Sequence, residues 1–211
     1  RSEKYKLEGV DQADSITVNP HKMLGIPTTC SFLLLPQVKD FQTSMSLKAP
    51  YLFHGRENSD ENYDLADGTM GCGRRADAFK FYMGWLYYGT KGFESRVDHA
   101  YEIMNYFVAS IKKDKRFSLV IDNPQCLQVC FYYGYEGYDK LDKTAITRYI
   151  SRELHKQGKY LVDFSPNTTS NDGQGEFFRV VFNSPILTDK VVDDLIASII
   201  SAGEQFKKID N

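Results

Sequence analysis

The residues with the clearest chemical potential lie at 19–27 and read N-P-H-K-M-L-G-I-P. Lys22 follows a strand-like segment and a turn, a place where α/β folds gather ligands. The residues after it are apolar, and an ammonium group among apolar side chains is poorly solvated. That environment favours the neutral amine, which is the form that makes Schiff bases. From residue types alone, the competing interpretation is a surface lysine beside a solvated turn histidine, His21.

Two other features carry weaker chemical signals. The glycine-rich run 68–73 precedes a predicted helix, as phosphate-binding loops do. It follows no strand and lacks the Lys-Ser/Thr pair of a P-loop, so a hinge is the preferred interpretation. The histidines His54, His99 and His155 show no metal-ligand spacing with cysteines or carboxylates, so we predict no metal site.

Length and composition exclude several classes of protein. The chain has 211 residues, a net charge of −2 and 42% hydrophobic residues, which is not the composition of a disordered protein. A pI near 6.1 provides no basic field for nucleic acid. Unbroken apolar stretches such as 32–35 are far shorter than the roughly 20 residues that span a bilayer. Four cysteines without C-x-x-C spacing predict reduced thiols and favour a cytoplasmic location.

Two strands are predicted on either side of Lys22. Residues 14–18 alternate polar and apolar side chains and end at Asn19-Pro20, a turn signal, and a second strand is predicted over 30–35. The stretch 54–71 is acidic, contains several glycines and has no periodicity. A segment of that length is typical of a lid or a binding loop.

Helices and short strands are predicted for the rest of the chain. Phe79, Tyr82, Met83 and Leu86 recur at helical spacing and predict a helix over 77–88, which Gly89 and Gly92 interrupt. A longer helix is predicted over 93–113. The remaining pattern predicts the order β-β-α-β-β-α, with strands at 117–121, 128–133, 160–164 and 177–182 and helices at 144–157 and 188–207.

Residues 14–27 (D-S-I-T-V-N-P-H-K-M-L-G-I-P) resemble the segment around the cofactor lysine of the pyridoxal-phosphate-dependent group II amino-acid decarboxylases. The glutamate decarboxylase branch is the closest match. Five further motifs occur in the family's order and approximate spacing: Y-L-F at 51–53, Y-D-L at 63–65, C-G-R-R-A-D at 72–77, G-F-E at 92–94 and F-F-R-V at 177–180. The resemblance therefore covers essentially the whole chain.

This resemblance implies an α/β protein of the pyridoxal-phosphate fold type I, the aspartate aminotransferase-like architecture. Residues 1–91 would be the C-terminal part of the large cofactor-binding domain, with the cofactor lysine and a mobile catalytic loop. Residues 92–211 would be the C-terminal small domain. Family members are much longer and supply further cofactor contacts upstream, so we interpret the chain as the C-terminal portion of a decarboxylase and expect it to be inactive by itself.

The resemblance also assigns roles to individual residues. Lys22 would form the Schiff base with pyridoxal 5′-phosphate, and His21 and Asn19 would contact the phosphate end of that cofactor. Tyr63 matches the mobile-loop tyrosine that delivers a proton after carbon dioxide leaves. Arg179 matches the arginine that holds the substrate carboxylate, although without the motif it would be interpreted as a strand arginine on a solvated face.

The implied activity is α-decarboxylation of an acidic amino acid, with L-glutamate giving 4-aminobutyrate as the first choice. Cysteine sulfinate and aspartate decarboxylases are close alternatives, since the residues that set specificity lie largely upstream. The resemblance also implies a homodimer with its active sites at the subunit interface. A different class of function stays open, in which the chain is a non-catalytic, truncated partner subunit.

Overall fold

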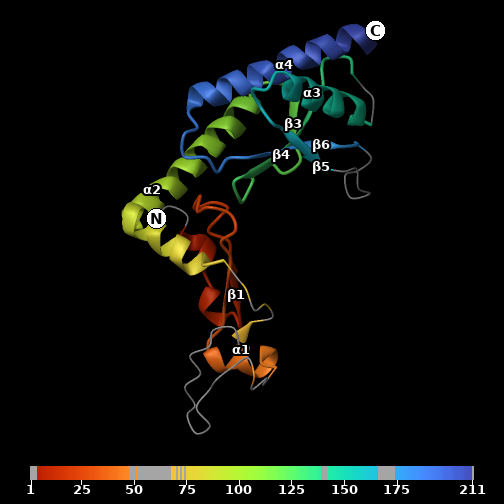
Figure 1. The fold of residues 1–211 in the computed structure, drawn as a ribbon. Helices are drawn as coiled ribbons and strands as arrows, with labels where there is room; N and C mark the ends of the chain where they lie inside the picture. The colour runs from red at the N-terminus through yellow and green to blue at the C-terminus, as the bar shows by residue number, and fades with distance from the viewer. Residues whose placement is uncertain are drawn as a thin grey trace. The chain divides into compact units, whose positions relative to one another are not determined.

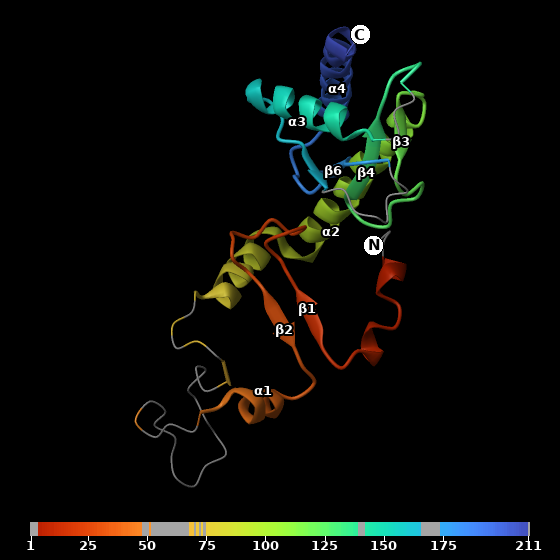
Figure 2. The same cartoon turned by 90° about the vertical axis from the view of Figure 1, so that its right-hand side faces the viewer.

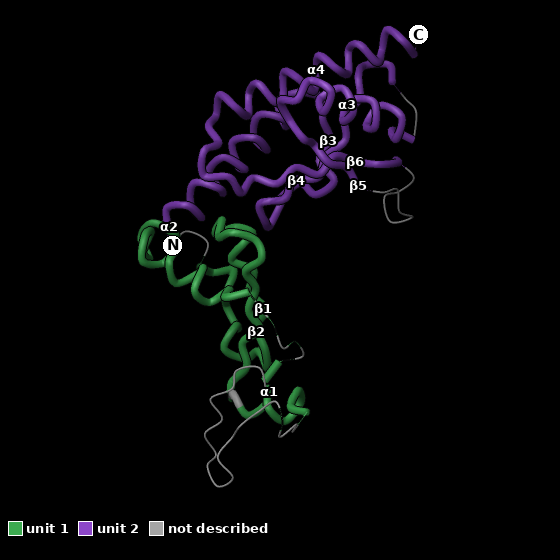
Figure 3. The backbone as a smooth tube through the Cα atoms, in the orientation of Figure 1, with its two compact units in different colours: residues 1–93 green, residues 94–211 purple. Residues whose placement is uncertain are grey.

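The computed structural model describes residues 4–47, 51, 68–69, 71, 73, 75–138, 142–165 and 174–210. The chain forms two compact units, Arg1–Phe93 and Glu94–Asn211, which Figure 3 shows in green and purple. Each unit contains its own sheet and its own cluster of buried side chains. Across the described ranges, every helix is too short or too polar to cross a membrane.

The first unit is built around a short antiparallel pair of strands. Two 3-10 turns, η1 (Lys4–Leu7) and η2 (Val10–Gln12), precede β1 (Ile16–Val18), which pairs with β2 (Phe32–Leu34). Figure 2 shows β1 and β2 side by side. Both strands predicted around Lys22 are confirmed, although each is shorter than its sequence pattern. Residues 19–31 form the loop between them, so the paired strands hold both ends of that loop.

The helix α1 (Val38–Met45) was not among the predicted elements. It has eight residues, and Gln37 at its N-cap makes no side-chain capping hydrogen bond. Because the helix lacks the Ser, Thr, Asp or Asn that usually marks a helix start, the sequence offered little to predict it from.

The helix α2 (Asp77–Ile111) contains one residue with a non-helical backbone, Gly89, at φ 61° and ψ −178°. This combination is readily adopted only by glycine, because a Cβ would collide with the neighbouring backbone. The sequence predicted an interruption at both Gly89 and Gly92. The break at Gly89 is confirmed, whereas Gly92 stays within the helix.

The apolar stripe predicted for the first half of α2 does not face the core of the first unit. Its members, Phe79, Tyr82, Met83 and Leu86, are 60%, 57%, 50% and 62% exposed. Phe81 packs instead against the core formed by Ile26, Cys30 and Phe93. The helix is apolar on several sides here, so the periodicity predicted the element correctly but does not identify its buried face.

The second unit contains a four-stranded antiparallel sheet in the order β3-β4-β6-β5. Its strands are β3 (Phe117–Leu119), β4 (Gln128–Tyr133), β5 (Asp163–Ser165) and β6 (Phe177–Val181). The helices α3 (Thr144–Lys156) and α4 (Asp189–Asp210) pack against each other, as Figure 1 shows. The predicted order of a helix followed by β-β-α-β-β-α is confirmed. Thr188, the first residue of the predicted helix, caps α4, since its hydroxyl accepts the Val191 N–H at 3.4 Å.

Aromatic side chains fill the core of the second unit. Alternate residues of β4 share one face of the sheet, where the Phe131 ring lies 5.4 Å from that of Phe107 on α2 and 5.2 Å from that of Phe178 on β6. A Cβ added to Gly203 of α4 would lie 2.2 Å from Cε1 of Tyr133, on the same face of the strand. The helices α2 and α4 therefore cover the same face of this sheet.

Candidate active site

Two consecutive turns hold the backbone around Lys22. The Lys22 N–H donates to the Asn19 carbonyl at 2.9 Å, and the Gly25 N–H donates to the Lys22 carbonyl at 3.3 Å. The Ile26 N–H then donates to the Pro20 carbonyl at 3.1 Å, which closes the segment on itself. Gly25 has φ 64°, a left-handed conformation that glycine adopts without strain. The backbone of Lys22 is therefore held in place by hydrogen bonds within the loop at 19–31.

The end of this turn is attached to α2 through Ile26. This side chain is only 4% exposed and belongs to the core cluster with Cys30 and Phe93. A Cβ added to Gly84 of α2 would lie 2.5 Å from Cδ1 of Ile26, so the missing side chain at Gly84 makes room for it. Burial of an isoleucine of this kind contributes about 2 kcal/mol and fixes the turn on the helix.

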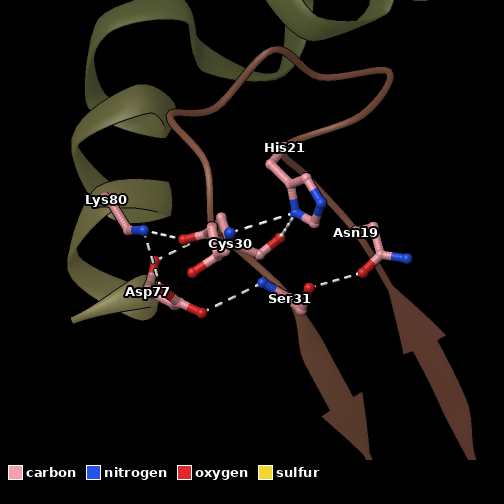
Figure 4. Close-up of polar contacts among 7 residues, drawn as sticks. Asn19, His21, Cys30, Ser31, Asp77 and Lys80 are labelled. Carbon is pink, nitrogen blue, oxygen red and sulfur yellow. Dashed lines mark hydrogen bonds and ion pairs between the residues drawn. The ribbon is translucent and has the colours of Figure 1, made fainter. Parts of the chain in front are cut away.

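The imidazole of His21 is oriented by the main chain of Cys30. Its Nδ1 lies 2.5 Å from the Cys30 carbonyl oxygen and 3.2 Å from the Cys30 amide nitrogen. Figure 4 shows Nδ1 turned toward Cys30 and the other ring nitrogen, Nε2, turned away from it. Because the Cys30 backbone occupies Nδ1, Nε2 is the nitrogen that can serve a ligand.

Asn19 is oriented in a similar way by the residue that follows Cys30. The Ser31 hydroxyl donates to Oδ1 of Asn19 at 2.7 Å, which leaves the amide N–H groups of Asn19 available as donors. Asn19 is exposed and His21 is half-buried. Nε2 of His21 carries a proton when Nδ1 accepts the Cys30 N–H. In that tautomer, this turn offers the nucleophilic amine of Lys22 and two hydrogen-bond donors suited to an anion. That donor set fits an aldehyde-bearing phosphate ester such as pyridoxal phosphate.

The environment of Lys22 differs from the one expected from the sequence. Its side chain is exposed, and the apolar residues after it turn inward: Leu24 packs against the core and Ile26 joins it. The described part of the chain therefore does not enclose the amine among apolar groups. Side chains from elsewhere would have to provide that enclosure.

Arg179 belongs to the second unit, and its side chain makes an ion pair. Its Nη2 lies 2.6 Å from Oδ2 of Asp163 on the neighbouring strand β5, and both side chains are exposed. The hydrogen bond from Arg179 lowers the pKa of the Asp163 carboxyl. Of the predicted site residues, the structure brings Asn19, His21 and Lys22 together and places Arg179 in the other unit. Tyr63 and most of the predicted lid at 54–71 lie outside the described residues.

Sequence reasoning missed a set of polar contacts behind the turn. Ser31, Asp77 and Lys80 connect the loop to the start of α2. The D-A-F-K spacing at 77–80 carried a signal, because residues three apart on a helix can form an ion pair. The burial of the loop against this helix turn was not visible in the sequence.

Comparison with known proteins identifies the family. A model described as the pyridoxal-dependent decarboxylase conserved domain matches residues 1–134. The chain belongs to the pyridoxal-dependent decarboxylase family. The resemblance stated from the sequence motifs is thereby confirmed, and pyridoxal phosphate is confirmed as the cofactor of the family.

Two relatives are decarboxylases of acidic amino acids by name. The chain is 42% identical over 206 residues to L-aspartate decarboxylase dtxS4 of Metarhizium robertsii, with 96% of this chain and 40% of the relative covered. It is 36% identical over 214 residues to acidic amino acid decarboxylase GADL1 of Mus musculus, with 96% and 38% covered. The chain thus spans about two fifths of the length of these relatives.

Two solved structures share the fold of this chain. Mouse CSAD matches with a TM-score of 0.81 and 28% identity over 96% of this chain and 42% of its own. Oryza sativa TDC with PLP and tryptamine matches with a TM-score of 0.83, and at 23% identity over 97% and 41% it supports the fold alone. The predicted fold class is confirmed.

Proposed function

We propose that the full-length protein is a pyridoxal-phosphate-dependent α-decarboxylase of an acidic amino acid. One observation carries the proposal: the turn at Asn19, His21 and Lys22 presents an amine beside two oriented donors in a chain of this family. Pyridoxal phosphate, when bound, accepts the electron pair that remains when the carboxylate leaves as carbon dioxide.

Three residues of the turn would hold the cofactor. The Lys22 amine would attach to its aldehyde, and the exposed position of Lys22 gives access from outside the turn. Nε2 of His21 and the amide of Asn19 would donate to its phosphate. Both groups are already oriented through Cys30 and Ser31, so binding would cost little side-chain entropy.

Arg179 would bind a carboxylate of the substrate. One of its nitrogens contacts Asp163 at 2.6 Å, and the remaining N–H groups of the planar guanidinium can meet a second carboxylate. Arg179→Lys keeps the charge but loses this two-point geometry, so kcat/KM should fall about tenfold or more. An unchanged kcat and KM would return Arg179 to the role of a surface strand residue.

Tyr63 would donate the proton that the substrate α-carbon needs after carbon dioxide has left. The mobile loop that the family resemblance implies here would, on closing, bring the phenol to that carbon and exclude water. Tyr63→Phe should therefore keep cofactor binding while amine product falls relative to aldehyde product. An unchanged product ratio over many turnovers would remove Tyr63 from the catalytic residues.

The choice among acidic substrates stays a proposal. The sequence motifs favoured L-glutamate, whereas the names of the relatives support L-aspartate and acidic amino acids in general. Release of carbon dioxide should be measured with L-glutamate, L-aspartate and L-cysteine sulfinate, using L-tryptophan as the control. We expect an acidic substrate to exceed L-tryptophan by at least about 100-fold in kcat/KM. Failure with every acidic substrate, while pyridoxal phosphate is bound, would favour the non-catalytic partner subunit.

The proposal extends to the oligomeric state of the protein and to its location in the cell. A homodimer with active sites at the subunit interface is proposed from the family. Mixing Lys22→Ala subunits with Tyr63→Phe subunits should restore amine formation above that of either variant if the two residues serve one site across the interface. A cytoplasmic location is proposed because the described cysteines Cys30, Cys126 and Cys130 are free thiols. If the mixed Lys22→Ala and Tyr63→Phe subunits recover no activity, the proposal of a site shared across the interface is wrong.

A further inference from the structure

The first residue of α2, Asp77, carries a buried carboxylate. Asp77 is 8% exposed, its Oδ1 lies 2.9 Å from Nζ of Lys80, and its Oδ2 accepts the Ser31 N–H at 3.4 Å. Burying a carboxylate is costly unless charged and hydrogen-bonding partners compensate for the lost water. These partners come from one turn of the helix and from the loop after Lys22.

Three consecutive residues of the loop are attached to the start of this helix. The Lys80 ammonium donates to the Thr29 carbonyl as well as pairing with Asp77. The Cys30 thiol donates to the Asp77 carbonyl at 3.4 Å, and burial raises the pKa of this thiol, which keeps it protonated as a donor. Ser31 is held through its backbone amide. Figure 4 shows these contacts on one side of the segment.

The opposite side of the same segment orients the candidate cofactor ligands. The Cys30 main chain holds Nδ1 of His21, and the Ser31 hydroxyl holds Oδ1 of Asn19. In Figure 4, Nε2 of His21 and the amide nitrogen of Asn19 lie on the side away from Asp77 and Lys80. A continuous set of contacts therefore runs from the helix, through residues 29–31, to the two donors.

We propose that Asp77 and Lys80 are positioning residues that orient His21 and Asn19 toward the phosphate end of the cofactor. This inference rests on the function proposed above. Asp77 and Lys80 contact the segment 29–31, which in turn holds His21 and Asn19. They act through the Thr29–Ser31 backbone, so loosening the segment would misplace both donors at once.

The main test is cofactor affinity in the full-length apoprotein. Lys80→Met should raise the Kd for pyridoxal phosphate about tenfold, because the variant loses both the charge-assisted hydrogen bond to the Thr29 carbonyl and the ion pair with Asp77. Lys80→Arg, which keeps the charge, should stay within about twofold of the wild type. A matched control is Lys156→Met, since Lys156 forms an exposed i,i+3 pair with Glu153 at 2.8 Å in α3. That variant should leave the Kd unchanged.

A purely structural role for Lys80 gives a different result. Lys80→Met would then lower the thermal midpoint of the apoprotein while its Kd, measured well below that midpoint, stayed at the wild-type value. That outcome would overturn the proposal. If Lys80→Met does not fold, Ser31→Ala provides the test. This variant removes the hydroxyl that orients Asn19, while the buried Asp77 carboxylate keeps both Lys80 and the Ser31 N–H as partners. Its Kd should rise about threefold, and a wild-type value would overturn the proposal.

Coupling between residues tests the route of action. In a background lacking both donors, Asn19→Ala with His21→Ala, Lys80→Met should weaken binding by no more than about twofold. A full tenfold effect in that background would show that Lys80 acts by another route and would overturn the inference. A wild-type apoprotein that takes up no pyridoxal phosphate would refute the proposed function itself, which is a separate outcome.

Discussion

The loop at 19–31 and the core of the second unit are stabilised by different kinds of interaction. The loop is held by backbone turns, one buried isoleucine and the contacts of Asp77 and Lys80. The second unit is held by interlocking rings, with Phe107 lying 5.4 Å from Phe131 and 4.9 Å from Phe182. Directional contacts can aim side chains at a ligand, whereas ring packing mainly contributes stability. Substitutions in the loop at 19–31 should therefore mainly reduce activity, whereas substitutions in the core of the second unit should mainly reduce folding stability.

The sharpest test of this difference is Lys22→Ala. The Lys22 side chain is exposed, so its removal should change the free energy of unfolding of the apoprotein by less than about 0.5 kcal/mol. The thermal midpoint should therefore change little. Decarboxylation should fall by roughly a thousandfold or more, because no other residue can replace the amine. Activity is followed by release of carbon dioxide, and borohydride reduction of the wild type should place the pyridoxyl group on Lys22. A label on another lysine would contradict the assignment.

Phe107→Ala reverses the comparison. This ring is fully buried and contacts both Phe131 and Phe182, so its removal should destabilise the protein by about 3–5 kcal/mol. The loss should appear as a lower urea midpoint for the unfolding transition of the full-length protein. Tyr87→Ala, at a side chain that is 82% exposed, is the control and should shift that midpoint little. A cost below about 1 kcal/mol for Phe107→Ala would show that the aromatic core is not the main source of stability.

Two glycine substitutions compare the packing of the two units directly. Gly203→Ala would place Cβ 2.2 Å from the buried ring of Tyr133, and a rigid ring cannot move aside, so we expect a loss of about 1–3 kcal/mol. Gly84→Ala would place Cβ 2.5 Å from the end of the Ile26 side chain, which can rotate. The gain in helix propensity, about 1 kcal/mol, should leave that variant close to wild type. Equal losses in thermal unfolding would contradict the difference in packing.

The smallest effect is expected from Asp163→Asn. Arg179 lowers the pKa of Asp163 in the folded protein. The ion pair therefore contributes its full stability above the unfolded-state pKa of about 3.9. That contribution is lost as the pH falls through the folded-state pKa of Asp163. Both side chains are exposed, so at pH 7 the loss should be below about 0.5 kcal/mol. Wild type and variant should converge in stability at acidic pH, once Asp163 is protonated in the folded protein as well. A difference that persists there would assign the effect to packing.

Much of the fold could be predicted because its signals are local. Alternation of apolar residues and turn residues located both strands around Lys22, and Thr188 marked the start of α4. The same approach missed α1, which has no capping side chain. Periodicity located the first half of α2 but could not identify its buried face, because apolar residues occur there on several sides.

The sequence by itself predicted the residue types gathered in the Lys22 segment, the order of the elements after residue 77 and the membership of the family. These depend on residue types and spacings within a few positions of one another. The tertiary structure alone decided which groups orient His21 and Asn19. Ser31 and Asp77 are 46 positions apart and Thr29 and Lys80 are 51 apart, and no local pattern connects them. They meet because Ile26 and Cys30 are buried against α2, which brings the polar groups of the two segments within hydrogen-bonding distance.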